Sequence, residues 1–221
     1  MFRQPETPAV PEAYFGVWQR KLLRAPGLED TTTRVYWLQT RHWHGDIRVP
    51  AGRPAFAGHT SLARLGTDQL LALARQQGFG GVTHVDGDLC RWLRQQDFQP
   101  PSGDNDIGRM EFETSERVFE HGVERKYFEI WERLPDSVGS EFVRIGDDSM
   151  LLGTGDYFIH LRPRPLELPI APSLSALAAD AEALRALVDF EISFGTRRGA
   201  DPAGWTIDLS TLPWREGSAP V

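Results

Sequence analysis

Short segments in which apolar and polar residues alternate follow one another along most of this chain, and turn-forming residues separate them. Alternation with a period of two is typical of β-strands that bury one face. The segments with this pattern are residues 14–24, 34–41, 46–49, 80–85, 88–98, 107–113, 117–121, 125–134, 141–145, 150–153, 157–162, 190–195 and 205–209. The pattern therefore predicts about a dozen strands.

Two short turns indicate how neighbouring strands pair. Asp86-Gly87 separates the segments 82–85 and 89–92, and His121-Gly122 lies between two of the later strands. Dipeptides of this kind favour the tight turns of β-hairpins, which join antiparallel strands. We therefore expect consecutive strands to pair antiparallel.

Two segments have the longer period of helices. Residues 68–77 follow Thr67, which can cap a helix, and end at Gly78, which suits the residue after a helix end. Residues 173–187 carry leucines at helical spacing. A proline-rich stretch, residues 163–172, precedes this second helix and is predicted to be a long surface connection.

So many short strands must protect their edges from pairing with other chains. Closure into a barrel removes the edges, so the fold predicted is a mainly β protein built on an antiparallel barrel with two short helices. A β-sandwich is the main alternative. We expect an N-terminal barrel over residues 1–135 and a β-rich part with one helix over residues 136–221, which packs on the barrel, completes it or forms a second one.

Composition and charge restrict the cellular compartment and the classes of partner that we expect. Cys90 is the one cysteine, so no internal disulfide can form, and the first residues contain no apolar leader. Both features favour the cytoplasm. The 24 basic residues are outnumbered by 31 acidic ones, giving a net charge of −7 without a basic run, so we expect neither a nucleic acid nor a membrane as partner. Oligomeric state is left open.

A motif on the first strand points to a family. Gly16-Val17-Trp18 resembles the Gly-x-Trp signature of lipocalins and their calycin relatives. Further segments resemble a family of bacterial and fungal lipocalin-like proteins built from two barrel-like halves. These segments are residues 87–92, 97–101, 106–110 and 131–134. The resemblance implies a fold and no particular activity.

The resemblance also implies a structural role for the tryptophan. In lipocalins this side chain closes the base of the barrel, and an arginine from the last strand region stacks across it. Trp18 matches the first role, together with Gly16 of the motif. We assign the second role to Arg215, with Arg197 or Arg198 as alternatives.

Aromatic and arginine side chains share faces of several predicted strands. If these faces point inward, they form a cavity suited to a small planar or anionic molecule held by stacking and forked hydrogen bonds. The residues predicted to bind such a ligand are Trp37, Trp92, Arg94, Tyr127, Glu129, Trp131, Arg133 and His160. The alternative interpretation is that these residues only pack the barrel and face solvent.

Other functions have weaker support in the sequence. His42 and His44 lie on one face of a strand, with Asp46 nearby, and this spacing could serve a metal site in an enzyme. A haem held by His121 or His160 is a further alternative. No catalytic motif is present, and we expect no cofactor. A barrel filled by its own side chains and acting through protein contacts is the second hypothesis, ahead of the enzyme.

Overall fold

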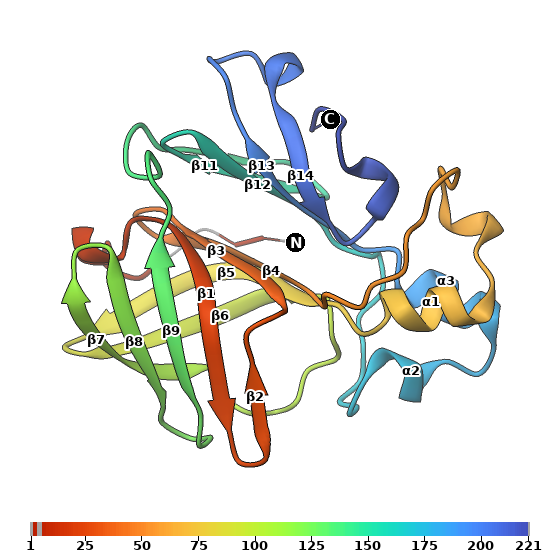
Figure 1. Cartoon of the computed structure of the whole chain (residues 1–221), viewed down its shortest axis with the longest axis horizontal. Helices are drawn as coiled ribbons and strands as arrows, with labels where there is room; N and C mark the ends of the chain where they lie inside the picture. Colours follow the sequence, from red (N-terminus) through yellow and green to blue (C-terminus); the bar gives the residue numbers. More distant parts are fainter. Residues whose placement is uncertain (1, 4–5, 221) are drawn as a thin grey trace.

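The computed structural model describes residues 2–3 and 6–220, which fold into a β-barrel and a second sheet packed against it (Figure 1). The first nine strands form one sheet. They are β1 Gly16–Ala25, β2 Leu28–Asp30, β3 Arg34–Gln39, β4 Trp43–Val49, β5 Gln77–Asp86, β6 Leu89–Asp97, β7 Ile107–Thr114, β8 Arg117–Gly122 and β9 Phe128–Arg133.

This sheet closes on itself. Its strands lie in the order β2-β1-β3-β4-β5-β6-β7-β8-β9, and β1 also pairs with β9. All of these pairings are antiparallel. The short strand β2 pairs only with the far end of β1, so eight strands form the closed barrel. The predicted antiparallel barrel is confirmed.

A second, open sheet follows the barrel in the chain. Its strands are β10 Phe142–Ile145, β11 Met150–Thr154, β12 Tyr157–Arg162, β13 Glu191–Thr196 and β14 Thr206–Ser210, paired antiparallel in this order. Within the described residues, no strand of this sheet pairs with a barrel strand, and its outer strands do not pair with each other. The C-terminal part therefore neither completes the barrel nor forms a second one.

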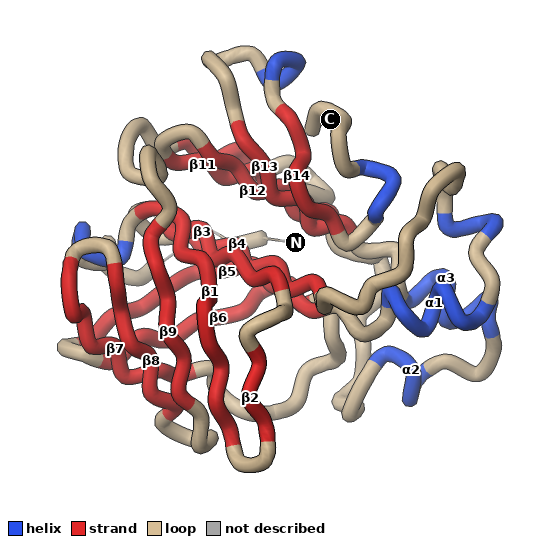
Figure 2. Tube along the Cα trace, in the orientation of Figure 1, coloured by secondary structure: helices blue, strands red, loops and turns tan. Residues whose placement is uncertain are grey.

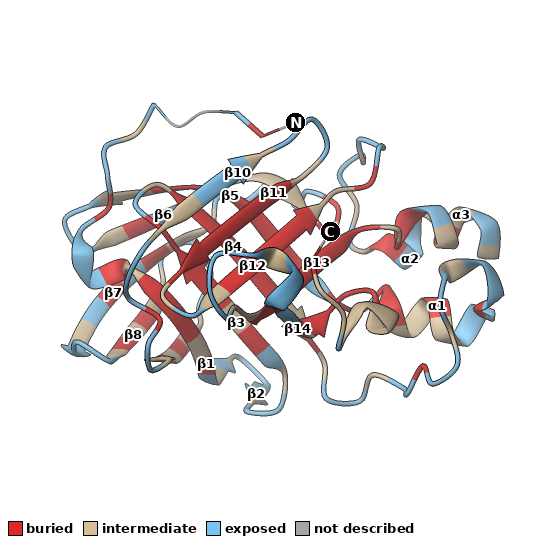
Figure 3. Cartoon of the chain, turned by 90° about the horizontal axis from the view of Figure 1, so that it is seen from above, coloured by how far each residue is buried: buried red, intermediate tan, exposed pale blue. Residues whose placement is uncertain are grey.

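The second sheet covers the outer face of β3, β4 and β5 (Figure 3). Two paired glycines, Gly45 on β4 and Gly80 on β5, bring the layers close together. A Cβ atom on Gly45 would lie 2.6 Å from Cγ2 of Ile159, and one on Gly80 would lie 2.7 Å from Cδ2 of Leu161. Gly45 and Gly80 therefore serve sheet packing, because side chains there would separate the two layers.

The three α-helices lie together beside one end of the barrel and the second sheet (Figure 2). The α-helices are α1 Thr67–Leu73, α2 Leu174–Leu177 and α3 Ala181–Leu187, and the 3-10 helices are η1 Glu12–Tyr14, η2 Leu62–Arg64, η3 Pro202–Gly204 and η4 Pro213–Arg215. Helix α1 begins one residue earlier than predicted, because Gly66 is its N-cap and donates its backbone N–H to Oε1 of Gln69. No helix in the described residues is long and apolar enough to cross a membrane.

The second predicted helix is divided in two. The carboxylate of Asp180 accepts a hydrogen bond from the backbone N–H of Ala183, and this cap starts α3. Ala178 before it has extended backbone angles, which end α2. Aspartate caps helices well but is less favourable inside them, so the break follows from local chemistry.

The base of the barrel is closed by Trp18 and an arginine. Nε1 of Trp18 donates to the carbonyl oxygen of Tyr14, and the guanidinium carbon of Arg133 lies 4.6 Å from the Trp18 ring centre. The expectation that Arg215 stacks there is wrong, because Arg215 ends η4, after the last strand of the second sheet, and donates to Glu191 on β13. The alternative Arg197 is also bound elsewhere, since its Nε donates to the carbonyl oxygen of Gly155.

Candidate functional site

A cavity of about 1260 Å³ opens at the end of the barrel opposite Trp18. Three indole rings that line it, those of Trp37, Trp92 and Trp131, are almost completely buried. Trp37 contacts the other two edge to face, with ring centres 5.4 Å from Trp92 and 5.9 Å from Trp131. The three rings come from β3, β6 and β9 and form an aromatic floor, and Trp37 packs on Trp18 of the base with ring centres 6.2 Å apart.

Charged side chains stand above this floor on the inner wall. Nε and Nη2 of Arg48 donate to the two carboxylate oxygens of Asp46, at 2.8 and 3.2 Å. Buried Arg20 binds two acids, with 2.8 Å to Glu129 and 2.8 Å to Asp30. Each of these guanidinium groups is therefore neutralised by carboxylates of the protein itself.

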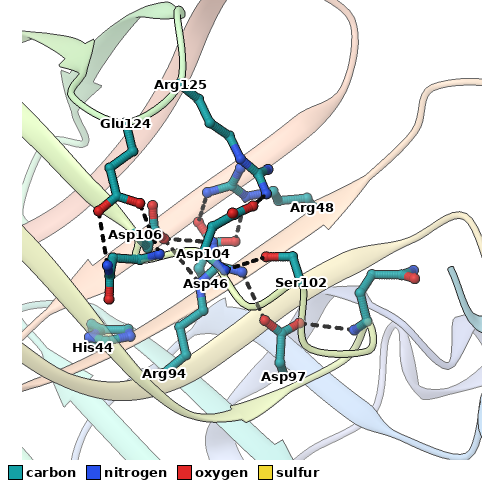
Figure 4. Close-up of polar contacts among 12 residues, drawn as sticks. His44, Asp46, Arg48, Arg94, Asp97, Ser102, Asp104, Asp106, Glu124 and Arg125 are labelled. Carbon is teal, nitrogen blue, oxygen red and sulfur yellow. Dashed lines mark hydrogen bonds and ion pairs between the residues drawn. The ribbon is translucent and has the colours of Figure 1, made fainter. Parts of the chain in front are cut away.

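The mouth of the cavity is formed by two loops that are bonded to each other (Figure 4). Arg94 at the end of β6 bonds to Asp97 at 2.8 Å and to Asp106 at 2.5 Å. In the same region Nδ2 of Asn105 donates to Glu124, while Arg125 pairs with Asp104. These contacts connect residues 97–106 to the β8–β9 connection.

Glu120 is an acid of the cavity wall that is buried and hydrogen-bonded to two neutral side chains. Its side chain is 3% exposed, and its oxygens accept hydrogen bonds from the hydroxyl of Tyr127 at 2.5 Å and from Nε1 of Trp131 at 2.9 Å. Glu129 lies directly opposite it in the β8–β9 pairing. Burial, followed by the negative charge of Glu129, raises the pKa of Glu120 well above its ordinary value.

A chain of hydrogen bonds lies deeper in the barrel and fixes His44. Oε1 of Gln39 accepts from Nε1 of Trp37 and from the hydroxyl of Thr83, so that hydroxyl has no proton left for His44. Nδ1 of His44 lies 3.0 Å from the same hydroxyl and must therefore donate to it. Burial lowers the pKa of His44 to about 3, so the ring is neutral and Nε2 carries a free lone pair without a partner.

Six of the eight residues predicted to bind a ligand line this cavity. They are Trp37, Trp92, Arg94, Tyr127, Glu129 and Trp131. Arg133 is at the barrel base instead, over Trp18. His160 lies on β12 of the second sheet, where Nδ1 is 3.6 Å from Glu191, so the prediction that it lines the barrel is wrong. Local alternation could not reveal that β12 belongs to a different sheet.

The histidine spacing does not produce a metal site in this structure. Among residues 2–3 and 6–220, no group of three or more His, Cys, Asp or Glu side chains is arranged to hold a metal ion. His44 is turned to Thr83, and Nδ1 of His42 is buried without a partner. Neither His121 nor His160 lines the cavity, which gives no support to an axial haem ligand.

Sequence reasoning missed several groups of the wall, above all Glu120 and Arg48. Glu120 shares a strand face with the apolar Val118, and a carboxylate on an otherwise apolar inward face was the signal that could have revealed it. Its partner groups could not be recognised, because Tyr127 lies in the β8–β9 connection and Trp131 on β9. Cys90, by contrast, is buried in the lower barrel, and burial raises the pKa of its thiol well above the ordinary value.

An eight-stranded up-and-down barrel that closes its first strand on its last has the architecture of lipocalins, so the lipocalin-like fold expected from Gly16 and Trp18 is confirmed. No family model matches the sequence, and no curated protein matches it. A lipocalin-like protein from Bacteroides uniformis ATCC 8492 is similar over 55% of this chain and 99% of that chain, at 10% identity and a TM-score of 0.36. At that TM-score the likeness is weak, and the fold assignment follows from the strand pairing of this chain itself.

Proposed function

We propose that this protein binds a small organic molecule with a planar ring inside the barrel. The observation that carries this proposal is the open cavity with a floor of three indole rings. Its volume of about 1260 Å³ includes space beside residues 164–172, outside the barrel, and exceeds the roughly 300–1,000 Å³ of cavities that hold drug-sized ligands. Trp92 is the most exposed ring of the floor, at 7%, and offers a surface on which a planar group can stack.

The charges of the wall favour this ligand over a simple anion. The described residues that line the cavity include eight acidic side chains and five arginines. Arg48, Arg94 and Arg125 are already paired with carboxylates. At these three arginines an anion would have to compete with carboxylates, whereas Arg91 and Arg164 make no ion pair among the described residues, so ring stacking has the broader support.

The other hypotheses have less support from the geometry. A filled barrel acting through protein contacts requires an interior without room for a ligand, whereas this one is open at the mouth. A metal-dependent enzyme requires a complete ligand set, and the described residues provide none. Ligand binding remains the function that uses the observed interior.

Native mass spectrometry of the full chain, purified from its own host, tests the proposal. We expect a stoichiometric organic molecule on the wild-type protein and its loss from Trp92→Ala. Trp205→Ala is the matched control, because Trp205 is a buried tryptophan of the second sheet, away from the cavity. Circular dichroism checks that both variants fold.

A wild-type mass without any adduct, together with no binding of planar ring compounds in solution, would refute ligand binding and favour the filled barrel. Equal loss of the molecule from Trp92→Ala and Trp205→Ala would place the ligand outside the aromatic floor.

A further inference from the structure

The cavity contains one buried carboxylic acid that has no basic partner. Glu120 makes no ion pair within the described part of the chain, although its side chain lines the cavity and is 3% exposed. Its neighbour Glu129 is paired with Arg20 at 2.8 Å, and Asp46 and Asp106 are paired with Arg48 and Arg94. These three acids of the wall therefore have arginine partners, whereas Glu120 has no counter-charge among the described side chains.

The space for this side chain is also built into the wall. Gly108 on β7 has no side chain at the point where Glu120 lies, and a Cβ atom there would be 2.7 Å from Cγ of Glu120. Tyr127 and Trp131 hold the two carboxyl oxygens in place. The carboxyl group is thus fixed in one orientation. It lies beside the aromatic floor, because Trp131 is a ring of that floor and also donates to Glu120.

The charged groups around Glu120 influence the pKa of its carboxyl. They are Glu129 on β9, Asp106 before β7 and Arg48 on β4, and the hydroxyl of Tyr127 also faces it. Burial and the two acids raise the pKa of Glu120, while Tyr127 and Arg48 oppose this only in part. Burial and the two acids therefore favour the neutral form of the carboxyl, and a positive charge beside it would favour the ionised form.

Resting on the proposed function, we propose that the ligand carries a positively charged nitrogen next to its planar ring, and that this nitrogen lies against Glu120. A cation there gains the buried carboxylate as a partner and the faces of nearby indole rings as further attraction. A cation at this position lowers the pKa of the carboxyl, so the proton that its neutral form carries passes to the buffer as the ion pair forms. An amine or amidine on an aromatic ring system has this chemistry.

Isothermal titration with three indole compounds on equal two-carbon tethers tests the ligand charge. Tryptamine is cationic, tryptophol is neutral and indole-3-propionate is anionic. We expect wild-type protein to bind tryptamine at least about tenfold more tightly than either of the others, a difference of about 1.4 kcal/mol. Titration in two buffers of different ionisation enthalpy should show release of a proton with tryptamine alone.

Glu120→Gln identifies the residue responsible. Glutamine keeps an acceptor for Trp131 and can donate to the oxygen of Tyr127, so the fold is retained while the charge is lost. We expect it to weaken tryptamine binding about tenfold and to leave tryptophol binding unchanged. Glu111→Gln, which changes a 70% exposed carboxylate, is the matched control and should change neither.

The outcomes separate the two proposals. Binding of all three compounds with similar affinity, or unchanged tryptamine binding by Glu120→Gln, overturns the charge preference while ligand binding stands. Binding of none of them at millimolar concentration overturns the charge preference, and ligand binding falls with it only if the native mass spectrum of the wild type also shows no adduct.

Discussion

The guanidinium carbon of Arg133 lies 4.6 Å from the centre of the Trp18 ring, and the two residues are direct partners in the pairing of β9 with β1. The pair therefore stands at the point where the barrel closes. Nη2 of Arg133 also donates to the carbonyl oxygen of Ala13, at 2.8 Å, which connects the N-terminal segment to the same point. The side chain of Arg133 therefore contacts both the tryptophan at the barrel base and the N-terminal segment, at the strand pair that closes the barrel.

We predict that Arg133→Ala lowers the free energy of unfolding by about 1–2 kcal/mol, because it removes a cation–π contact and a hydrogen bond. Urea denaturation measures the loss, and the indole N–H resonance of Trp18 should shift. Arg215→Ala is the matched control and should leave that resonance in place. A shift with Arg215→Ala, and none with Arg133→Ala, would contradict the assignment.

The packing of the two sheets predicts a second effect. Gly45→Ala should lower the free energy of unfolding by about 1–3 kcal/mol, because the added methyl group would meet Ile159 at a distance that forces the layers apart. Gly52→Ala is the control, since a Cβ atom at Gly52 meets nothing within 4 Å. Thermal unfolding compares the two. Equal stability of the variants would mean that the layers do not meet at Gly45.

The hydrogen-bond chain to His44 makes a spectroscopic prediction. The ring should be the neutral Nδ1–H tautomer and should not titrate between about pH 8 and about pH 5, because burial holds its pKa near 3. Nitrogen-15 NMR of the imidazole measures both properties. A titration close to the ordinary histidine value would show that the ring is accessible to water.

The partner of that ring can be changed separately. Thr83→Val removes the hydroxyl shared by His44 and Gln39, leaves both groups buried without it, and should cost about 1–3 kcal/mol of stability. Thr60→Val, at an exposed threonine, provides the control. A cost no larger than that of Thr60→Val would contradict the hydrogen-bond chain.

Glu191 in the second sheet predicts a dependence of stability on pH. Burial would raise its pKa, but contacts with His160 and Ser193 and the charge of Arg215 outweigh burial and lower the pKa to about 2. A carboxyl whose pKa is depressed on folding stabilises the protein above its unfolded value of 4.5, and the effect is lost as the pH falls toward 2. Glu191→Gln should therefore cost about 3 kcal/mol at neutral pH.

Urea denaturation across the acid range measures this effect. The difference in stability between wild type and Glu191→Gln should shrink as the pH falls from neutral toward 2. Glu182→Gln, at an exposed glutamate of α3, should show no such trend. A difference that is independent of pH would mean that Glu191 contributes packing and not charge.

The sequence by itself determined most strands and which residues share a strand face, while it left open which face points into the barrel. Alternation is a local property, so it placed Trp37, Trp92 and Trp131 on the faces that form the cavity floor. It missed β2, which has three residues, too few to show a period of two. The proline-rich connection and the helical segments were also readable, because capping and turn residues act within a few positions.

Only the tertiary structure decided which distant residues meet. Arg133 rather than Arg215 covers Trp18, because closure of β1 on β9 sets that register. His160 does not line the cavity, because its strand β12 belongs to the second sheet. Glu120 lies beside Glu129 because β8 pairs with β9 in this register. Such contacts depend on strand register and sheet order, which are fixed by packing across the whole chain and not by neighbouring residues.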